Sequence, residues 1–150
     1  ARLVPVDQVD AAWANLAASD AIVFGSPTYM GTVSAPFKAF MDATSQVWLE
    51  RGWKNKLAAG FTISGSPSGD KLNTLQTLMT YALQHGMLWI GNAEVSYNEE
   101  GINRLGSYVG VMAQAGQVAP EVEPIEADRR TARIFGQRVA EAAARWKRGA

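Results

Sequence analysis

Short apolar runs alternate with longer segments of helical periodicity along most of this chain. Residues 21–25 form the first run, Ala-Ile-Val-Phe-Gly, and residues 57–63 and 87–90 repeat the pattern. Runs of this length with β-branched residues are typical of strands buried on both faces. The first two runs are followed by apolar residues at helical spacing over 34–44 and 72–83. Strand, helix and strand in this order predict a parallel sheet with right-handed crossovers.

Further helices complete this pattern. A short amphipathic helix is expected ahead of residue 20, and a long helix over 131–146, where apolar residues recur regularly. Gly86 is expected to end the helix over 72–83 as a left-handed cap. The stretch 92–124 is rich in Gly, Asn and Ser and predicts mostly loop. Because no repeat or linker interrupts the chain, residues 1–150 predict a single three-layer α/β/α domain.

Composition excludes several classes of function. The chain has no cysteine and one histidine, which rules out a disulfide framework and a multi-histidine metal site, and we expect no metal. The formal net charge is zero and the basic residues form no compact stripe, which argues against nucleic acid as the main partner. No apolar run approaches the length of a membrane span, and no signal-peptide pattern is present. We therefore expect a soluble cytoplasmic protein without membrane insertion.

The first strand predicted over 21–25 needs a neighbour on its second edge. Without one, that edge would expose unpaired backbone groups. Residues 2–6 read as the tail of an earlier strand. We therefore expect one strand, a loop and a helix ahead of Ala1, roughly 35–45 residues if they form one βα unit and part of the next strand. The alternative is a small domain that is complete as it stands.

Two loops of small residues follow the predicted strands, over 25–31 and 64–69. In open parallel sheets, ligands bind outside the carboxyl ends of the strands. Glycines let the backbone approach a flat ring closely, Tyr29 or Met30 offers a surface for stacking, and hydroxyl and N–H groups suit the polar edge of a heterocycle. The two loops therefore predict a slot for an aromatic cofactor. Gly, Ser and Pro are also standard turn residues, so ordinary strand-to-helix turns remain the alternative.

The order of these segments resembles a known family. Residues 20–29 resemble the third strand and flavin loop of the flavodoxin-like NAD(P)H:quinone oxidoreductases, the tryptophan repressor-binding protein family. Residues 61–66 are similar to its second flavin loop, and His85-Gly86-Met87 to a turn of the family. Other matching segments are 37–42, Trp48, Tyr108-Val109-Gly110 and Ala115-Gly116. The resemblance covers essentially the whole chain and implies a flavodoxin-like, doubly wound parallel sheet, with the first strand and the phosphate loop missing from the visible chain.

The resemblance also implies an activity and a set of site residues. FMN would receive hydride from NAD(P)H and pass two electrons to a quinone by a ping-pong mechanism, in a homo-oligomer, either a dimer or a tetramer. His85 would be the catalytic residue, donating a hydrogen bond to a quinone oxygen, and Trp48 and Tyr108 would form walls of the substrate slot. The residues implied to hold FMN are Pro27, Thr28, Tyr29, Met30, Gly31, Ser64, Gly65 and Ser66.

Other interpretations remain open at this stage. The helix dipole alone favours His85 in a last helical turn, and Trp48 could be a core or subunit-interface residue. The main functional alternative is a flavodoxin-type one-electron carrier without a substrate of its own. Such a carrier docks on basic partners, which favours an acidic surface, whereas this chain has 14 acidic and 14 basic residues. A flavin or azo-dye reductase and a flavin-free interaction module are further alternatives.

Overall fold

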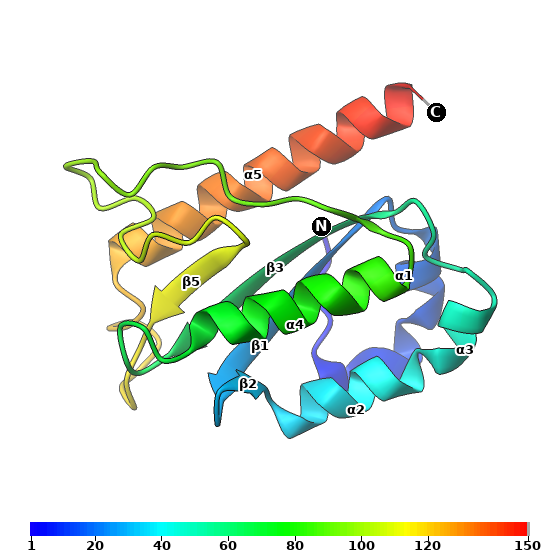
Figure 1. Cartoon of the computed structure of the whole chain (residues 1–150), viewed down its shortest axis with the longest axis horizontal. Helices are drawn as coiled ribbons and strands as arrows, with labels where there is room; N and C mark the ends of the chain where they lie inside the picture. Colours follow the sequence, from blue (N-terminus) through cyan, green and yellow to red (C-terminus); the bar gives the residue numbers. More distant parts are fainter. Residues whose placement is uncertain (150) are drawn as a thin grey trace.

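The computed structural model describes residues 1–149 and contains one sheet with helices on both of its faces (Figure 1). The central pair is parallel and consists of β1 (Ala21–Tyr29) and β3 (Leu57–Ser64). On its other edge, β3 pairs in parallel with β4 (Leu88–Trp89) and β5 (Val111–Gln114). The short β2 (Thr32–Val33) is antiparallel to the end of β1. The predicted parallel sheet is confirmed.

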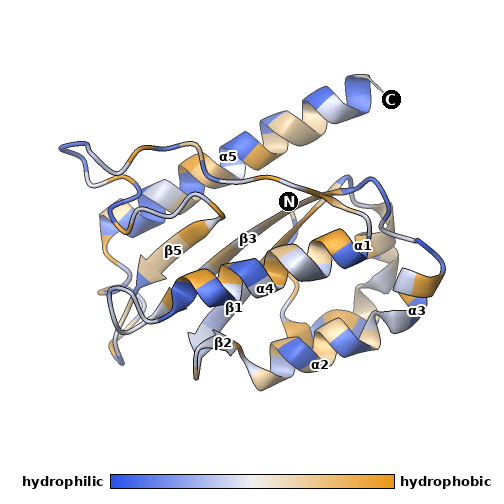
Figure 2. Ribbon diagram, viewed as in Figure 1, coloured by the Kyte–Doolittle hydropathy of each residue, from blue (hydrophilic) through white to orange (hydrophobic). Residues whose placement is uncertain are grey.

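Two helical layers enclose this sheet. One face is covered by α2 (Ala35–Ala43) and α4 (Lys71–Gln84), and the other by α5 (Glu126–Arg148). Figure 2 shows hydrophobic and hydrophilic residues alternating along α5, as expected for a helix with one buried face. The remaining helices are η1 (Val6–Ala11), α1 (Trp13–Ala18) and α3 (Ser45–Leu49). The left-handed cap predicted at Gly86 is present, with φ of 73°.

An aromatic cluster fills the core between β1, α2 and α4. Ile22 and Phe24 point to this face because alternate residues of a strand share a face. The ring of Phe24 meets that of Tyr81 edge to face at 5.2 Å and that of Phe37 at 6.5 Å. Trp53, only 1% exposed, closes the cluster. Burying these large rings stabilises the position of α4 against β1 and β3.

One strand of the sheet is interrupted. β4 pairs with the beginning of β3 at Leu57 and Ala58, and β5 pairs with its end from Phe61 to Ser64. Residues 90–110 leave the sheet between these two pieces and return to it. The sequence predicted mostly loop over 92–124, and β5 is the exception within that stretch. Its apolar residues are few and flanked by glycine, and its strand conformation depends on the free edge of β3, which is distant in sequence.

The first predicted loop is also partly strand. β1 continues to Tyr29, and Met30 and Gly31 form a two-residue turn into β2 with φ of 48° and 85°. Two successive positive φ angles match the twist of a hairpin, although methionine pays a steric cost there that glycine does not. From Ala21 to Pro27, β1 pairs with β3 alone among the described residues. The expectation of a further strand on its second edge stays a prediction.

The close approach of β5 to β3 gives a test of this architecture. A Cβ added at Gly110 would lie 2.3 Å from the carbonyl oxygen of Gly60 and 2.9 Å from Leu75, so Gly110→Ala should lower the free energy of unfolding by about 2–3 kcal/mol. At Gly136, within α5, an added Cβ meets no atom within 4 Å. Gly136→Ala is the matched control and should gain about 0.5–1 kcal/mol. Urea unfolding measures both, and equal effects of the two variants would contradict this packing.

Candidate functional site

The structure brings the two predicted binding segments to one edge of the sheet. Pro27 of β1 lies beside Ile63 of β3 in the parallel register. Residues 27–31 and 64–66 therefore leave neighbouring strands at their carboxyl ends. This is where ligands of open parallel sheets bind.

A bridge of threonine hydroxyls fixes the first segment. The Oγ1 atom of Thr28 lies 2.8 Å from that of Thr62 and 2.8 Å from that of Thr74. Thr62 and Thr74 are buried, so these hydroxyls satisfy groups that water cannot reach. The side-chain amide of Asn73 donates to the carbonyl oxygen of Gly31 at 2.8 Å. Thr28 and Gly31 are thereby tied to β3 and α4.

The residues at the tip of this segment face outward. Tyr29 is 70% exposed and Met30 is 92% exposed. A Cβ added at Gly31 would meet no described atom within 4 Å. An aromatic ring and a polarisable thioether on an open surface are suited to contact with a flat ligand.

A buried lysine holds the second segment. The Nζ atom of Lys71 donates to the carbonyl oxygen of Ser66 at 2.6 Å and to Oγ of Ser64 at 2.9 Å. The Lys71 side chain is fully buried. Gly69 has φ of 54°, and an added Cβ would lie 2.3 Å from Oγ of Ser64. Only glycine therefore allows the chain to close on Ser64 at this point.

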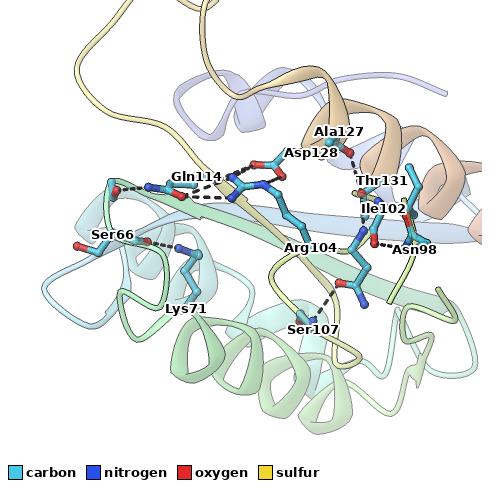
Figure 3. Close-up of polar contacts among 12 residues, drawn as sticks. Ser66, Lys71, Asn98, Ile102, Arg104, Ser107, Gln114, Ala127, Asp128 and Thr131 are labelled. Atoms are coloured by element: carbon cyan, nitrogen blue, oxygen red, sulfur yellow. Dashed lines mark hydrogen bonds and ion pairs between the residues drawn. The ribbon is translucent and has the colours of Figure 1, made fainter. Parts of the chain in front are cut away.

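A second set of contacts reaches the same segment from α5 (Figure 3). The side-chain amide of Gln114 donates to the carbonyl oxygen of Gly65 at 3.1 Å, and its oxygen accepts from Arg104 at 3.4 Å. Arg104 in turn binds both carboxylate oxygens of Asp128, at 2.7 and 2.8 Å. These hydrogen bonds, together with the charge of the nearly buried Asp128, raise the pKa of Arg104. Residues 64–66 are thus held from α4 on one side and from β5 and α5 on the other.

Hydrogen-bond donors remain free between these anchors. Among the described residues, no protein acceptor receives the backbone N–H groups of Gly65, Ser66 and Gly69. Together with the Ser66 hydroxyl, these groups can donate to carbonyl oxygens and ring nitrogens. A flat heterocycle such as the isoalloxazine ring of FMN carries such acceptors along its pyrimidine edge. The donor set at this edge of the sheet therefore fits the ring of a flavin.

His85 is buried at the other end of α4. Its Nε2 atom lies 3.0 Å from Oγ1 of Thr44. The Thr44 hydroxyl donates to the carbonyl oxygen of Met41 at 2.6 Å and accepts from Tyr81 at 2.8 Å. Since its one hydrogen is already used, Thr44 accepts from His85, which places the proton of the neutral ring on Nε2. Nδ1 is left buried without a partner.

This placement does not bring His85 to the two segments. The helix α4 runs for 14 residues from Lys71 to Gln84, and His85 follows its last residue, so Lys71 and His85 are separated by about 21 Å at 1.5 Å per residue. His85 is also only 3% exposed. Its burial beside Trp53 and Tyr81 explains its position without a role in chemistry. The contacts within one chain therefore do not support the predicted hydrogen bond from His85 to a quinone.

Trp48 and Tyr108 are both partly exposed. Trp48 is 44% exposed on α3, and Figure 1 shows α3 and the carboxyl end of α4 on the side of the molecule opposite the tip of β1. Tyr108 is 51% exposed in the 90–110 segment, where its carbonyl oxygen accepts from the N–H of Asn92. Both rings are open to contact from outside the chain.

Several features beyond these segments bear on ligands. A groove with a volume of about 690 Å³ lies between β4 and α5, lined in part by Trp89, Arg138 and Trp146, and it includes no predicted site residue. Within residues 1–149, no group of three or more His, Asp or Glu side chains is arranged to hold a metal ion. No helix in that range is long and apolar enough to cross a membrane.

Comparison with known proteins decides the family. The family model described as NADPH-dependent FMN reductase matches residues 3–101, about two thirds of the chain. The chain belongs to this family. The description of this family as NADPH-dependent FMN reductase confirms the predicted use of FMN and NAD(P)H by a flavin oxidoreductase.

Individual relatives agree with this assignment. The chain is 39% identical to Flavodoxin FldP of Pseudomonas aeruginosa, with 93% of this chain and 81% of that protein covered. It is 38% identical to an NAD(P)H dehydrogenase (quinone) of Archaeoglobus fulgidus, over 83% of this chain and 59% of that protein. A solved structure described as the flavodoxin, WrbA-like protein from Agrobacterium tumefaciens is 42% identical, with a TM-score of 0.72 over 91% of this chain and 73% of that one. The predicted flavodoxin-like α/β fold is confirmed.

Sequence reasoning missed several residues that shape the site. Polar side chains of these types also occur in ordinary strands and helices, so the sequence pattern gave no signal for Thr62, Thr74 and Gln114. Lys71 did carry a signal. It is the first residue of α4, where the helix dipole disfavours a positive charge, and such a placement indicates a compensating role.

The burial of His85 predicts a pH dependence of stability. Burial first, and then the charge of Arg51, lower the pKa of His85 below its ordinary value of 6.5. The unfolded chain therefore binds a proton before the folded chain does. The contribution of neutral His85 is complete above pH 6.5 and is lost as the pH falls from 6.5 through the lowered pKa.

Because His85 is the one histidine of the chain, no other side chain of its kind titrates in this range. In thermal unfolding experiments, the melting temperature should decrease as the pH is lowered from 7 to 5. The slope should be smaller in His85→Gln, which keeps a donor for Thr44 but does not titrate. An equal slope in both proteins would contradict the buried neutral ring.

Proposed function

We propose that this chain forms the ring-binding part of an FMN-dependent NAD(P)H:quinone oxidoreductase that works by two-electron, ping-pong hydride transfer. The observation that supports this most strongly is the pairing of β1 with β3, which places residues 27–31 beside residues 64–66. The relative from Archaeoglobus fulgidus, named as an NAD(P)H dehydrogenase (quinone), supports the choice of quinone as acceptor.

On this proposal the chain binds and orients the isoalloxazine ring. The backbone from Pro27 to Gly31 supports the ring, with Tyr29 and Met30 along its open side. Ser64, Gly65 and Ser66 hold its pyrimidine edge and the start of the ribityl chain through the free N–H groups and the Ser66 hydroxyl. When bound, FMN would supply the redox chemistry, the transfer of two electrons and a proton from NAD(P)H to a quinone, whose second proton would come from water.

The walls of the substrate slot are proposed to come from neighbouring subunits. Trp48 and Tyr108 are half exposed, and α3, which carries Trp48, lies on the side of the molecule opposite the tip of β1. A homodimer or homotetramer would let the Trp48 and Tyr108 rings of one subunit cover the flavin of another. Large exposed aromatic side chains are common at subunit interfaces. A cytoplasmic location is part of the same proposal.

The second candidate is a one-electron carrier. It is favoured by the relative named Flavodoxin FldP, which shares 39% identity. The balance of 14 acidic and 14 basic residues favours the enzyme, since it leaves no strong field to steer a docking partner. The two candidates differ in whether the flavin is reduced in one two-electron step or in two separable one-electron steps.

Flavin binding and turnover test the proposal. The purified chain should quench the fluorescence of added riboflavin or FMN, and with FMN it should oxidise NADPH in the presence of benzoquinone. Initial rates at varied concentrations of both substrates should give parallel double-reciprocal lines, which are characteristic of ping-pong kinetics.

A matched pair of variants links this activity to the site. Thr28→Val removes the hydroxyl that bridges Thr62 and Thr74, and should weaken riboflavin binding about tenfold, because a tenfold change corresponds to about 1.4 kcal/mol, the scale of one or two hydrogen bonds. Thr80→Val on α4 is the control and should bind normally. Reduction in two one-electron steps without quinone turnover would favour the carrier. Failure to bind any flavin would exclude both candidates.

A further inference from the structure

We propose that Lys71 is a positioning residue for the flavin ring: it fixes the second flavin segment and supplies a positive charge that favours the reduced, negatively charged ring over the oxidised one. This inference rests on the proposed function, because it assigns a ligand to residues 64–66. It gives a role to a buried charged residue whose placement is unfavourable in the chain by itself.

Two features make the position of Lys71 costly. It is the first residue of α4, and the partial positive charge at a helix amino end repels a cation. Its side chain is also fully buried, although lysine is among the residue types least often found without solvent contact. Stability alone would favour an uncharged residue at this point.

The partners of Lys71 do not offset this cost. Its Nζ atom donates to Oγ of Ser64 and to the carbonyl oxygen of Ser66, which are both neutral acceptors. Among the described residues, no ion pair includes Lys71, and Asp128, the carboxylate that raises its pKa, is bound by Arg104. Glu123 also acts on Arg104 and accepts from the N–H of Gly116. Lys71 therefore has no direct ion-pair partner, and the charge of Asp128 offsets the burial of its ammonium group only in part.

The lowered pKa of Lys71 agrees with its burial without an ion-pair partner. Burial lowers the pKa of its ammonium group, the charge of Arg104 lowers it further, and Asp128 offsets part of the effect. A negative charge beside residues 64–66 would relieve the burial of this cation. Charges interact strongly at such a position because little water lies between them.

The proposed reaction produces such a charge. When a neutral isoalloxazine ring takes hydride from NAD(P)H, it gains two electrons and one proton, and so carries one more negative charge, while NAD(P)⁺ leaves. Groups near the pyrimidine edge of the ring tune how readily this happens. Lys71, held against both Ser64 and Ser66, lies directly behind the segment proposed to bind that edge. With Lys71 in this position, the site should bind the reduced ring more tightly than the oxidised ring.

The test compares variants in their affinity for the two oxidation states of riboflavin, a probe that depends on the ring and not on the phosphate. Lys71→Met keeps the length of the buried side chain and removes the charge. Lys38→Met is the control, since Lys38 is exposed on α2 and pairs with Asp42. We expect Lys71→Met to weaken binding of reduced riboflavin at least tenfold more than binding of oxidised riboflavin. Lys38→Met should leave the ratio of the two affinities unchanged. Lys71→Arg, which keeps a positive charge, should change this ratio less than Lys71→Met does.

A measurement on the unaltered chain covers the case in which Lys71→Met does not fold. With ¹³C-labelled lysine, the pKa of Lys71 followed by NMR should rise when reduced riboflavin is bound. An equal loss of affinity for both oxidation states in Lys71→Met, or an unchanged pKa in the unaltered chain, would overturn the inference and leave Lys71 a structural residue. If the unaltered chain binds no riboflavin in either state, the proposed function itself fails, a result distinct from the other two.

Discussion

The parallel pairing of β1 with β3 is the constraint on which the rest of the structure depends. Because both strands run in one direction, their carboxyl ends meet at one edge, with Pro27 beside Ile63. Segments 34 residues apart in sequence thereby become neighbours, as the contact of Thr28 with Thr62 shows directly. The helix α4 can then support both segments, through Asn73 on the first and Lys71 on the second.

Polar groups at this edge are anchored, while those that face outward are free. Thr28, Lys71 and Arg104 each lie partly or wholly out of water and are hydrogen-bonded, which avoids the penalty of a buried unpaired group. Beside them, the N–H groups of Gly65, Ser66 and Gly69 have no acceptor within the described chain. Rigid support behind a set of free donors is the arrangement expected of a preorganised binding edge. His85, by contrast, is buried among aromatic rings within the chain, and its predicted role stays a prediction.

The sequence predicted those features that depend on local pattern. The apolar runs at 21–25 and 57–63 and the glycine at 86 have the same structural meaning in almost any context, and all three were correctly predicted. β5 was missed because its strand conformation depends on the distant edge of β3. The turn at Met30 was missed because methionine seldom adopts a positive φ. The placement of His85 at the far end of α4 follows from helix length and orientation, which the resemblance of a short turn to a family motif does not encode.

The central claim is that the two segments at the carboxyl ends of β1 and β3 form one flavin-binding edge. Two-dimensional ¹H–¹⁵N NMR of the chain during titration with riboflavin tests it most directly. The largest shifts should occur together at the amides of Gly31, Gly65, Ser66 and Gly69, with little change at Gly91 or Trp146 beside the groove of β4 and α5. Shifts concentrated at that groove, or confined to only one of the two segments, would contradict it.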